Sequence, residues 1–151
     1  MKFSTTAALL AATSTTVLAA PKALMPLQLN NLHIRHNKGV HKVMVDFDLI
    51  DLNKGTSGFK CEVQLMEDHP YNEQVNKPCA DALYEFGFPG GGVKNPRDLT
   101  LGARKVGDGA FYGQIEINEG AEWHCVDDSN PGGKFTECNL TGYLKIPVNL
   151  E

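Results

Sequence analysis

Four cysteines, arranged in two close pairs, are the residues of this chain best suited to do chemistry. Paired cysteines can form disulfides, bind zinc or supply a thiol nucleophile. The spacings from Cys61 to Cys79 and from Cys125 to Cys138 differ from the short C-x2-C and C-x4-C spacings of zinc sites. An even number of cysteines in a small secreted domain is typical of a disulfide framework. Four cysteines allow three connectivities, of which pairing between sequence neighbours is the simplest. It closes two loops of about 15 residues, each worth on the order of 3 kcal/mol, and leaves no thiol for catalysis.

The N-terminus predicts the compartment in which such disulfides form. Lys2 is followed by a short apolar run rich in small residues, and Val17-x-Ala19 fits the rule for signal-peptide cleavage. We expect cleavage after Ala19, so that residues 1–19 are the signal peptide and residues 20–151 form one mature domain. The run is shorter and richer in Thr than a transmembrane helix, which needs about 20 apolar residues. We therefore expect a secreted, extracellular protein with no membrane partner.

The charge of the chain argues against a nucleic-acid partner. The sequence contains 18 acidic and 14 basic residues, a net charge of −4, and loses one more positive charge when Lys2 leaves with the signal. Phosphate neutralisation would require a basic face. A basic strip nevertheless precedes the first acidic residue, Asp46. Its members are Lys22, Arg35, Lys38 and Lys42. We interpret the strip as a solvated strand–turn–strand edge, and the alternative is a surface that steers the protein toward an acidic partner.

Apolar residues alternate with polar ones along most of the mature chain, which is the period of a half-buried strand. The runs that we predict as strands are Leu27–Ile34, Val43–Leu49, Phe59–Leu65, Ala82–Phe88, Leu99–Ala103, Phe111–Ile117 and one or two strands within Phe135–Val148. Polar stretches at Glu67–Pro78, Pro89–Pro96 and Asn118–Asn130 are predicted loops, and no segment has a sustained helical period. About seven to nine short strands favour an all-β, single-domain antiparallel β-barrel or sandwich, stapled by the two disulfides.

The motifs that could carry catalysis or bind a metal are better explained by structure. His33 and His36 lie three apart on a predicted strand and so point to opposite faces. Asp46 and Asp48 share a face, where paired carboxylates can act as acid and base, but they alternate with core residues and we interpret them as a solvated face. The glycine run at 90–92 lacks the Gly-Lys-Ser/Thr ending of a phosphate loop. We expect no catalytic residue, no metal, no cofactor and no enzyme activity.

Two surface features are more specific. Asn139-Leu140-Thr141 is an N-x-[ST] sequon, which makes Asn139 a candidate glycosylation site in a secreted protein. Trp123, the single tryptophan, lies two residues before Cys125. Tryptophan is enriched at binding hot spots, and the alternative, which we favour, is that Trp123 packs over the second disulfide.

From Leu27 onward the chain resembles the Alternaria major allergen family of small secreted fungal proteins. The resemblance rests on the order and spacing of four segments. They are Gly58-Phe59-Lys60-Cys61, the Cys79 loop with the aromatic strand Leu83–Phe88, Leu99-Thr100-Leu101 before a hairpin, and the segment from Cys125 through Pro131–Cys138 to the closing strand. The resemblance implies an antiparallel β-barrel or sandwich and the same cysteine pairing. Members that form disulfide-linked dimers use a cysteine near the mature N-terminus, which residues 20–60 lack, so we expect no such dimer.

The resemblance also implies a function. It predicts a secreted effector or elicitor that binds a host extracellular protein, with a thaumatin-like plant defence protein as the candidate, and modulates plant immunity. The alternative is a carrier of flavonoids or other phenolics, held in the barrel or between protomers. The resemblance carries over no set of contact residues, and from the sequence we predict a binding surface that comprises the strip Arg35–Lys42 and the loops at Glu67–Pro78 and Pro89–Pro96. Its candidate residues are Arg35, His36, Lys38, Lys42, Tyr71, Lys94 and Trp123.

Overall fold

The computed structural model describes residues 23–55, 57–66, 76–89, 92–128 and 134–150. Within these ranges the chain forms eleven strands and no helix, which confirms the predicted all-β class. The predicted signal peptide lies outside the described residues, as does most of the predicted loop Glu67–Pro78. No helix among the described residues is long and apolar enough to cross a membrane.

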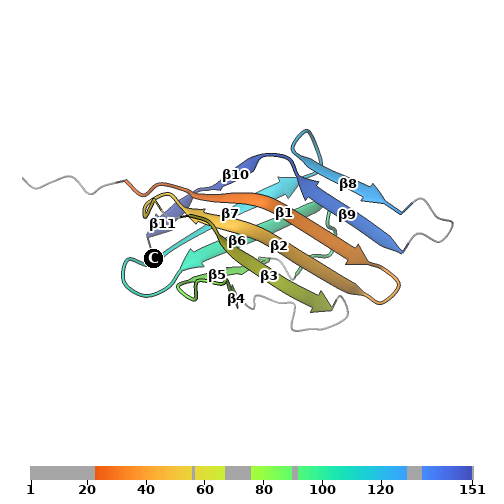
Figure 1. Cartoon of the computed structure of the whole chain (residues 1–151), viewed down its shortest axis with the longest axis horizontal. Coiled ribbons are helices and arrows are strands. Elements are labelled where there is room, and N and C mark those ends of the chain that lie inside the picture. Colours follow the sequence, from red (N-terminus) through yellow and green to blue (C-terminus); the bar gives the residue numbers. More distant parts are fainter. Residues whose placement is uncertain (1–22, 56, 67–75, 90–91, 129–133, 151) are drawn as a thin grey trace, which may run out of the picture.

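Six strands form the larger antiparallel sheet, sheet A (Figure 1). They are β1 (Leu27–Asn37), β2 (Lys42–Asp51), β3 (Phe59–Met66), β8 (Trp123–Asp127), β9 (Phe135–Leu140) and β10 (Tyr143–Ile146). The order is β3-β2-β1-β9-β8, and β10 continues the line of β9 by pairing with the first half of β1. Strand β1 is therefore the centre of the sheet, and β3 and β8 are its edges.

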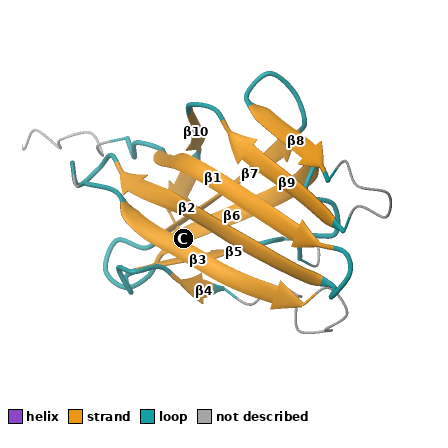
Figure 2. Ribbon diagram, turned by 45° about the vertical axis from the view of Figure 1, so that its right-hand side comes forward, coloured by secondary structure: helices purple, strands orange, loops and turns teal. Residues whose placement is uncertain are grey.

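Five strands form the second antiparallel sheet, sheet B, in the order β11-β7-β6-β5-β4. They are β4 (Lys77–Pro78), β5 (Tyr84–Gly87), β6 (Asp98–Lys105), β7 (Phe111–Asn118) and β11 (Val148–Leu150). The chain passes from sheet A to sheet B at Pro147, between β10 and β11. Figure 2 shows the two sheets as separate layers. The sheets are not closed into a barrel, so the barrel alternative of the sequence prediction is wrong.

The alternation along β1 is interrupted because the strand contains a bulge. Leu27 and Leu29 are buried, and so are Leu32 and Ile34, although the two pairs differ in parity. The register with β2 shifts between Asn30 and His33, and Asn31 has a positive φ of 52°. A bulge adds one residue to one strand of a pair. The apolar residues on both sides of it can therefore face the same core.

One hydrophobic core lies between the two sheets. Phe47 of β2 meets Phe86 of β5 edge to face, with ring centroids 4.9 Å apart, an arrangement that aromatic pairs prefer. The largest fully buried side chains are Trp123, Tyr84, Phe47, Phe86, Phe111, Leu27, Leu29, Leu32, Ile34, Leu49, Leu101 and Ile146. They come from both sheets, so the two inner faces pack into one core.

Both predicted disulfides are present, and they have different architectural roles. Cys61 of β3 bonds to Cys79, which directly follows β4, so this bridge joins an edge of sheet A to an edge of sheet B. Cys125 and Cys138 face each other across the β8–β9 ladder, so the second bridge joins two strands of sheet A that already pair. The two bridges therefore differ: Cys61–Cys79 connects the two sheets, whereas Cys125–Cys138 connects two neighbouring strands of one sheet.

The stretch Asn118–Asn130, predicted as a loop, contains strand β8, and that prediction is wrong. The alternating pattern of β8 covers only a few residues: Trp123 and Cys125 face inward, whereas His124 and Val126 face outward. This alternation was obscured because β8 is an edge strand with exposed polar residues. The closing segment, predicted as one or two strands, forms β9, β10 and β11.

Candidate functional site

The structure brings three of the predicted basic residues together at one end of sheet A. Arg35 lies near the end of β1, Lys38 in the following turn and Lys42 at the start of β2. The turn itself spans residues 38–41. The predicted strand–turn–strand is confirmed, but its position at an edge is wrong, because β1 and β2 lie inside the sheet.

Two predicted surface residues are buried, so neither belongs to a binding surface. His36 has 5% of its surface exposed because it shares the inward face of β1 with Ile34. Trp123 is 2% exposed, and its Nε1 donates a hydrogen bond to the Pro96 carbonyl oxygen at 2.9 Å. The Sγ of Cys125 lies 3.8 Å from the same oxygen, so the structural interpretation of Trp123 is the correct one.

The other predicted residues lie apart from this end of sheet A. Lys94 is exposed in the loop before β6, beside sheet B. Tyr71 lies outside the described residues. Asn139 is exposed on β9, and the hydroxyl of Thr141 donates a hydrogen bond to the Glu122 carbonyl oxygen at 3.0 Å. The sequon asparagine therefore lies on the outer face of sheet A, four residues along β9 from Phe135.

The outer face of sheet A carries apolar side chains around Arg35. One cross-strand row contains Met44 of β2, Arg35 of β1, Glu137 of β9 and Val126 of β8, which are aligned by the strand registers. Met44 is 50% exposed and Val126 is 68% exposed. We call the cluster formed by Arg35, Met44, Met66, Val126 and Phe135 the hairpin-end patch.

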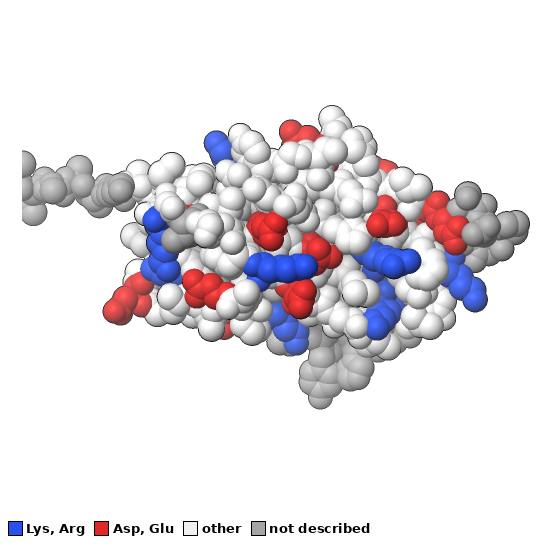
Figure 3. Space-filling view, viewed as in Figure 1, with Lys and Arg blue, Asp and Glu red and all other residues white. Residues whose placement is uncertain are grey.

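The guanidinium of Arg35 lies 4.8 Å from the centre of the Phe135 ring, which is within the range of a cation–π contact. A shallow hollow of about 390 Å³ opens beside this pair. The described residues that line it are Arg35, Val126, Asp127, Asp128, Phe135 and Glu137. Figure 3 shows Lys and Arg side chains at the end of this face where the β1–β2 hairpin turns, with Asp and Glu beside them and toward the middle. The patch therefore combines exposed apolar side chains with the charge of Arg35, and acidic side chains lie beside it.

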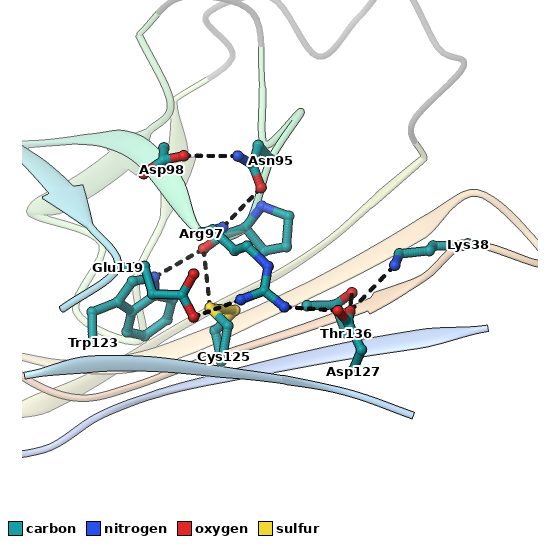
Figure 4. Close-up of a disulfide and its surroundings, with 11 residues drawn as sticks. Lys38, Asn95, Arg97, Asp98, Glu119, Trp123, Cys125, Asp127 and Thr136 are labelled. Atoms are coloured by element: carbon teal, nitrogen blue, oxygen red, sulfur yellow. Dashed lines mark hydrogen bonds and ion pairs between the residues drawn. A yellow bond between two sulfur atoms is a disulfide. The ribbon is translucent and has the colours of Figure 1, made fainter. Parts of the chain in front are cut away.

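Asp127 lines this hollow and makes several polar contacts, which Figure 4 shows. Its carboxylate accepts a hydrogen bond from Thr136 at 2.6 Å and lies 3.3 Å from the Lys38 ammonium and 2.8 Å from the Arg97 guanidinium. The Thr136 bond, followed by the Lys38 and Arg97 contacts, lowers the pKa of Asp127 to about 2. Arg97 also binds Glu119 at 2.5 Å, and this contact, with that to Asp127, raises the pKa of the guanidinium. Asp127 therefore remains ionised in all but strongly acidic solution.

The middle of the same face is polar. His33 on β1 has its Nδ1 3.1 Å from Asp46 Oδ1 and its Nε2 2.8 Å from Glu137 Oε1. The predicted outward position of Asp46 is confirmed, as is the opposite orientation of His33 and His36. Among the residues that the structure describes, no group of three or more His, Cys, Asp or Glu side chains is placed to hold a metal ion.

Sequence reasoning missed the apolar half of the patch. Met44 and Val126 occupy outward-facing positions of their strands, where most residues are polar. A single exposed apolar residue does not by itself indicate a binding surface. An apolar residue in the outward phase of an alternating strand was the available indication. It becomes meaningful only when several strands align such residues on one face.

No protein-family model matches the sequence, and no curated protein matches it. The fold is similar to two crystal structures of the major allergen Alt a 1 of Alternaria alternata. One is 17% identical, covers 83% of this chain and 93% of the allergen chain, and has a TM-score of 0.56. The other is 15% identical, covers 89% of this chain and 95% of the allergen chain, and has a TM-score of 0.59. The resemblance found in the sequence is thus confirmed at the level of the fold.

Proposed function

We propose that this chain is a secreted binding protein that acts by docking the hairpin-end patch on another extracellular protein. The observation that carries the proposal is the alignment of Met44, Arg35 and Val126 across the strands of sheet A, with the Phe135 ring against the Arg35 guanidinium. Arginine, methionine and aromatic residues are enriched in protein interfaces. Methionine side chains adapt to irregular partners. Because the sheet backbone is already ordered, little backbone conformational entropy is lost when they bind.

The partner that we propose is an apoplastic host protein, with a thaumatin-like defence protein as the first candidate, and the role is that of a fungal effector or elicitor. The allergen fold and the two disulfides support an extracellular, allergen-like protein. Binding rather than catalysis is the proposed mode of action, because both ring nitrogens of the outward His33 contact carboxylates, those of Asp46 and Glu137, so that neither nitrogen faces a substrate. A glycan on Asn139 would cover the same face and oppose docking.

The test is a titration of the purified, oxidised protein with a purified thaumatin-like protein by surface plasmon resonance. Arg35→Glu and Met44→Asp should each raise Kd by about tenfold or more, as expected for central interface residues. Leu150→Asp is the matched control, because Leu150 is 70% exposed on the edge of sheet B. Equal affinity of all variants, or no binding together with no defence response in infiltrated leaves, would contradict the proposal.

The second candidate is the carrier of a flavonoid or other phenolic. The space between the sheets is filled by aromatic and aliphatic side chains, so the ligand would have to occupy a surface hollow such as the one beside Arg35. A carrier predicts a higher melting temperature when the phenolic is added, since a ligand that binds only the native state stabilises it. An unchanged melting temperature across a series of flavonoids would leave protein binding as the function.

A further inference from the structure

The outer face of sheet B has a gap in its side chains. Gly87 of β5 and Gly102 of β6 are directly paired across the ladder, and both lie in the outward phase of their strands. A Cβ atom on Gly102 would lie 2.9 Å from the Tyr112 hydroxyl oxygen and 3.2 Å from Pro89 Cγ. These separations are shorter than normal carbon contacts. Glycine at 102 therefore allows the tyrosine ring and the proline ring to approach the backbone of the sheet.

Tyr112 reaches across the sheet to occupy this gap. It pairs with Arg104 in the β6–β7 register, and its ring lies diagonally over Gly102, a distance that aromatic side chains can span. Its hydroxyl donates a hydrogen bond to Gln114 Oε1 at 3.0 Å. The ring is thereby fixed over the sheet. A hollow of about 230 Å³ lies next to it, lined by Asn76, Gly87, Phe88, Pro89, Gly102 and Tyr112.

The nearest charges are already paired with each other. Arg104 donates from Nε and Nη2 to Glu85 Oε2 at 2.9 and 2.7 Å. With the Asn76 amide in the orientation that satisfies both of its ends, the amide oxygen also accepts from Arg104 at 3.2 Å. An ionic ligand would have to break this pair or remain without a partner, and burying an unpaired charge is costly. The hollow therefore suits an uncharged ligand that has an apolar face and a polar rim.

A second hollow continues on the other side of Pro89. It has a volume of about 350 Å³, and its lining combines the charged Lys94, Asp98 and Glu116 with the uncharged polar Asn95, Thr100 and Asn118. Pro89 lines both hollows. Because the two hollows share Pro89, a ligand that reaches both would be extended rather than a single small ring.

We propose that this face binds a neutral oligosaccharide built of pyranose units. One sugar ring would lie in the hollow beside Tyr112 and Pro89, whose rings cover Gly102, because a pyranose has an apolar C–H face and a rim of hydroxyl groups. Hydroxyl groups can both donate to and accept from the amides of Asn76 and Gln114, and an apolar wall with a few placed polar groups is the usual character of a small-ligand site. The proposal does not depend on the hairpin-end patch, which lies on the other sheet.

The test is a ¹H–¹⁵N NMR titration of the intact, oxidised protein with cellohexaose, laminarihexaose and chitohexaose. We expect saturable shift changes at Gly87, Gly102 and Tyr112 with at least one of these probes. Tyr112→Ala should weaken binding by about tenfold, the loss expected when an aromatic anchor is removed, whereas Tyr112→Phe should keep most of it. Tyr143→Ala is the matched control, because Tyr143 is 52% exposed on β10 of the other sheet.

A second variant separates loss of the site from loss of the fold. Gly102→Val should displace the Tyr112 and Pro89 rings that lie against this glycine and so abolish binding, and its amide spectrum away from β5–β7 shows whether the protein is folded. The proposal is overturned if no hexasaccharide shifts these resonances. It is also overturned if Tyr112→Ala binds as tightly as the parent protein, or if only a flavonoid perturbs the site.

Discussion

The two edges of sheet A are tied to sheet B by different means. Near the β3 edge the links are buried: Cys61 of β3 bonds covalently to Cys79, and the Tyr84 hydroxyl donates at 2.6 Å to the carboxylate of Asp51, the last residue of the neighbouring strand β2. At the β8 edge the links are all non-covalent: an exposed ion pair between Arg97 and Asp127 and a buried hydrogen bond from Trp123 Nε1 to the Pro96 carbonyl oxygen. An interaction removed from water gains strength and is costly to break, whereas an exposed ion pair contributes little. The β3 edge should therefore dominate stability.

The buried pair at the β3 edge is stabilised by several donors. Asp51 is 1% exposed, and burial alone would raise its pKa. The hydrogen bonds from Tyr84 and from the side chain and backbone of Asn53 outweigh burial and lower the pKa of Asp51 below its ordinary range. Burial and the neighbouring carboxylate raise the pKa of Tyr84. The pair is thus an ionised carboxylate that accepts from a neutral phenol.

The largest expected effect is the removal of the disulfide between the sheets. The two bridges span 18 and 13 residues, so chain entropy predicts similar losses of about 3 kcal/mol. Replacing both Cys61 and Cys79 by Ala should cost more than this, about 4 kcal/mol, because it also frees the edge of sheet A from sheet B. Replacing Cys125 and Cys138 should cost less, since their strands remain paired. Urea unfolding of the two double variants measures the difference, and equal losses would refute the comparison.

Removal of the buried phenol hydroxyl comes next. Tyr84→Phe leaves the Asp51 carboxylate in the core with one donor fewer, which should lower the free energy of unfolding by about 2 kcal/mol. Tyr112→Phe removes a hydroxyl from the surface of sheet B and should change the free energy by less than about 0.5 kcal/mol. A similar loss in both variants would show that burial is not the deciding factor.

A smaller effect is expected from the indole hydrogen bond at the β8 edge. Trp123→Phe keeps an aromatic ring in the core but leaves the Pro96 carbonyl oxygen without its donor at 2.9 Å. Chemical denaturation should show a loss of about 2 kcal/mol or less, and the loss should be smaller than that for Tyr84→Phe. A larger loss would reverse the order of the two edges.

The exposed ion pair should be detectable mainly through its pH dependence. The pKa of Asp127 is lowered to about 2. The stabilisation that its carboxylate gives to the folded state is therefore complete above the ordinary carboxyl pKa near 4 and is lost as the pH falls toward 2. The difference in melting temperature between the parent protein and Asp127→Asn should therefore shrink over this interval. Asp108→Asn, in the exposed β6–β7 turn, is the control. A difference that grows as the pH falls would contradict the assignment.

Much of the fold was predictable because alternation and cysteine spacing are local properties. The inward phases of Val43, Phe47 and Cys61 were correct, as were the pairing of the cysteines and the hairpin at Gly107–Gly109. The prediction failed where long-range contacts override local pattern. The bulge in β1 turned His36 inward, and the short strand β8 formed from a polar stretch because β9 offered it a partner.

The candidate site was predictable only in part. Arg35, Lys38 and Lys42 were identified from charge, and they do lie at one end of sheet A. Trp123 was proposed as a candidate for the surface, but the Pro96 carbonyl oxygen holds it in the core. The apolar members of the patch could not be found from local sequence, because an exposed methionine or valine is unremarkable until its neighbours on other strands are known.

The sequence by itself determined that this chain forms two-faced strands and two disulfides between sequence neighbours, because side-chain alternation and short loops act over a few residues. The tertiary structure decided that one disulfide crosses between the sheets and the other does not. It also decided which outward residues meet. Arg35 and Glu137 are aligned because β1 pairs with β9 across about a hundred residues of chain, and such a register is set by the packing of the whole core rather than by any local pattern.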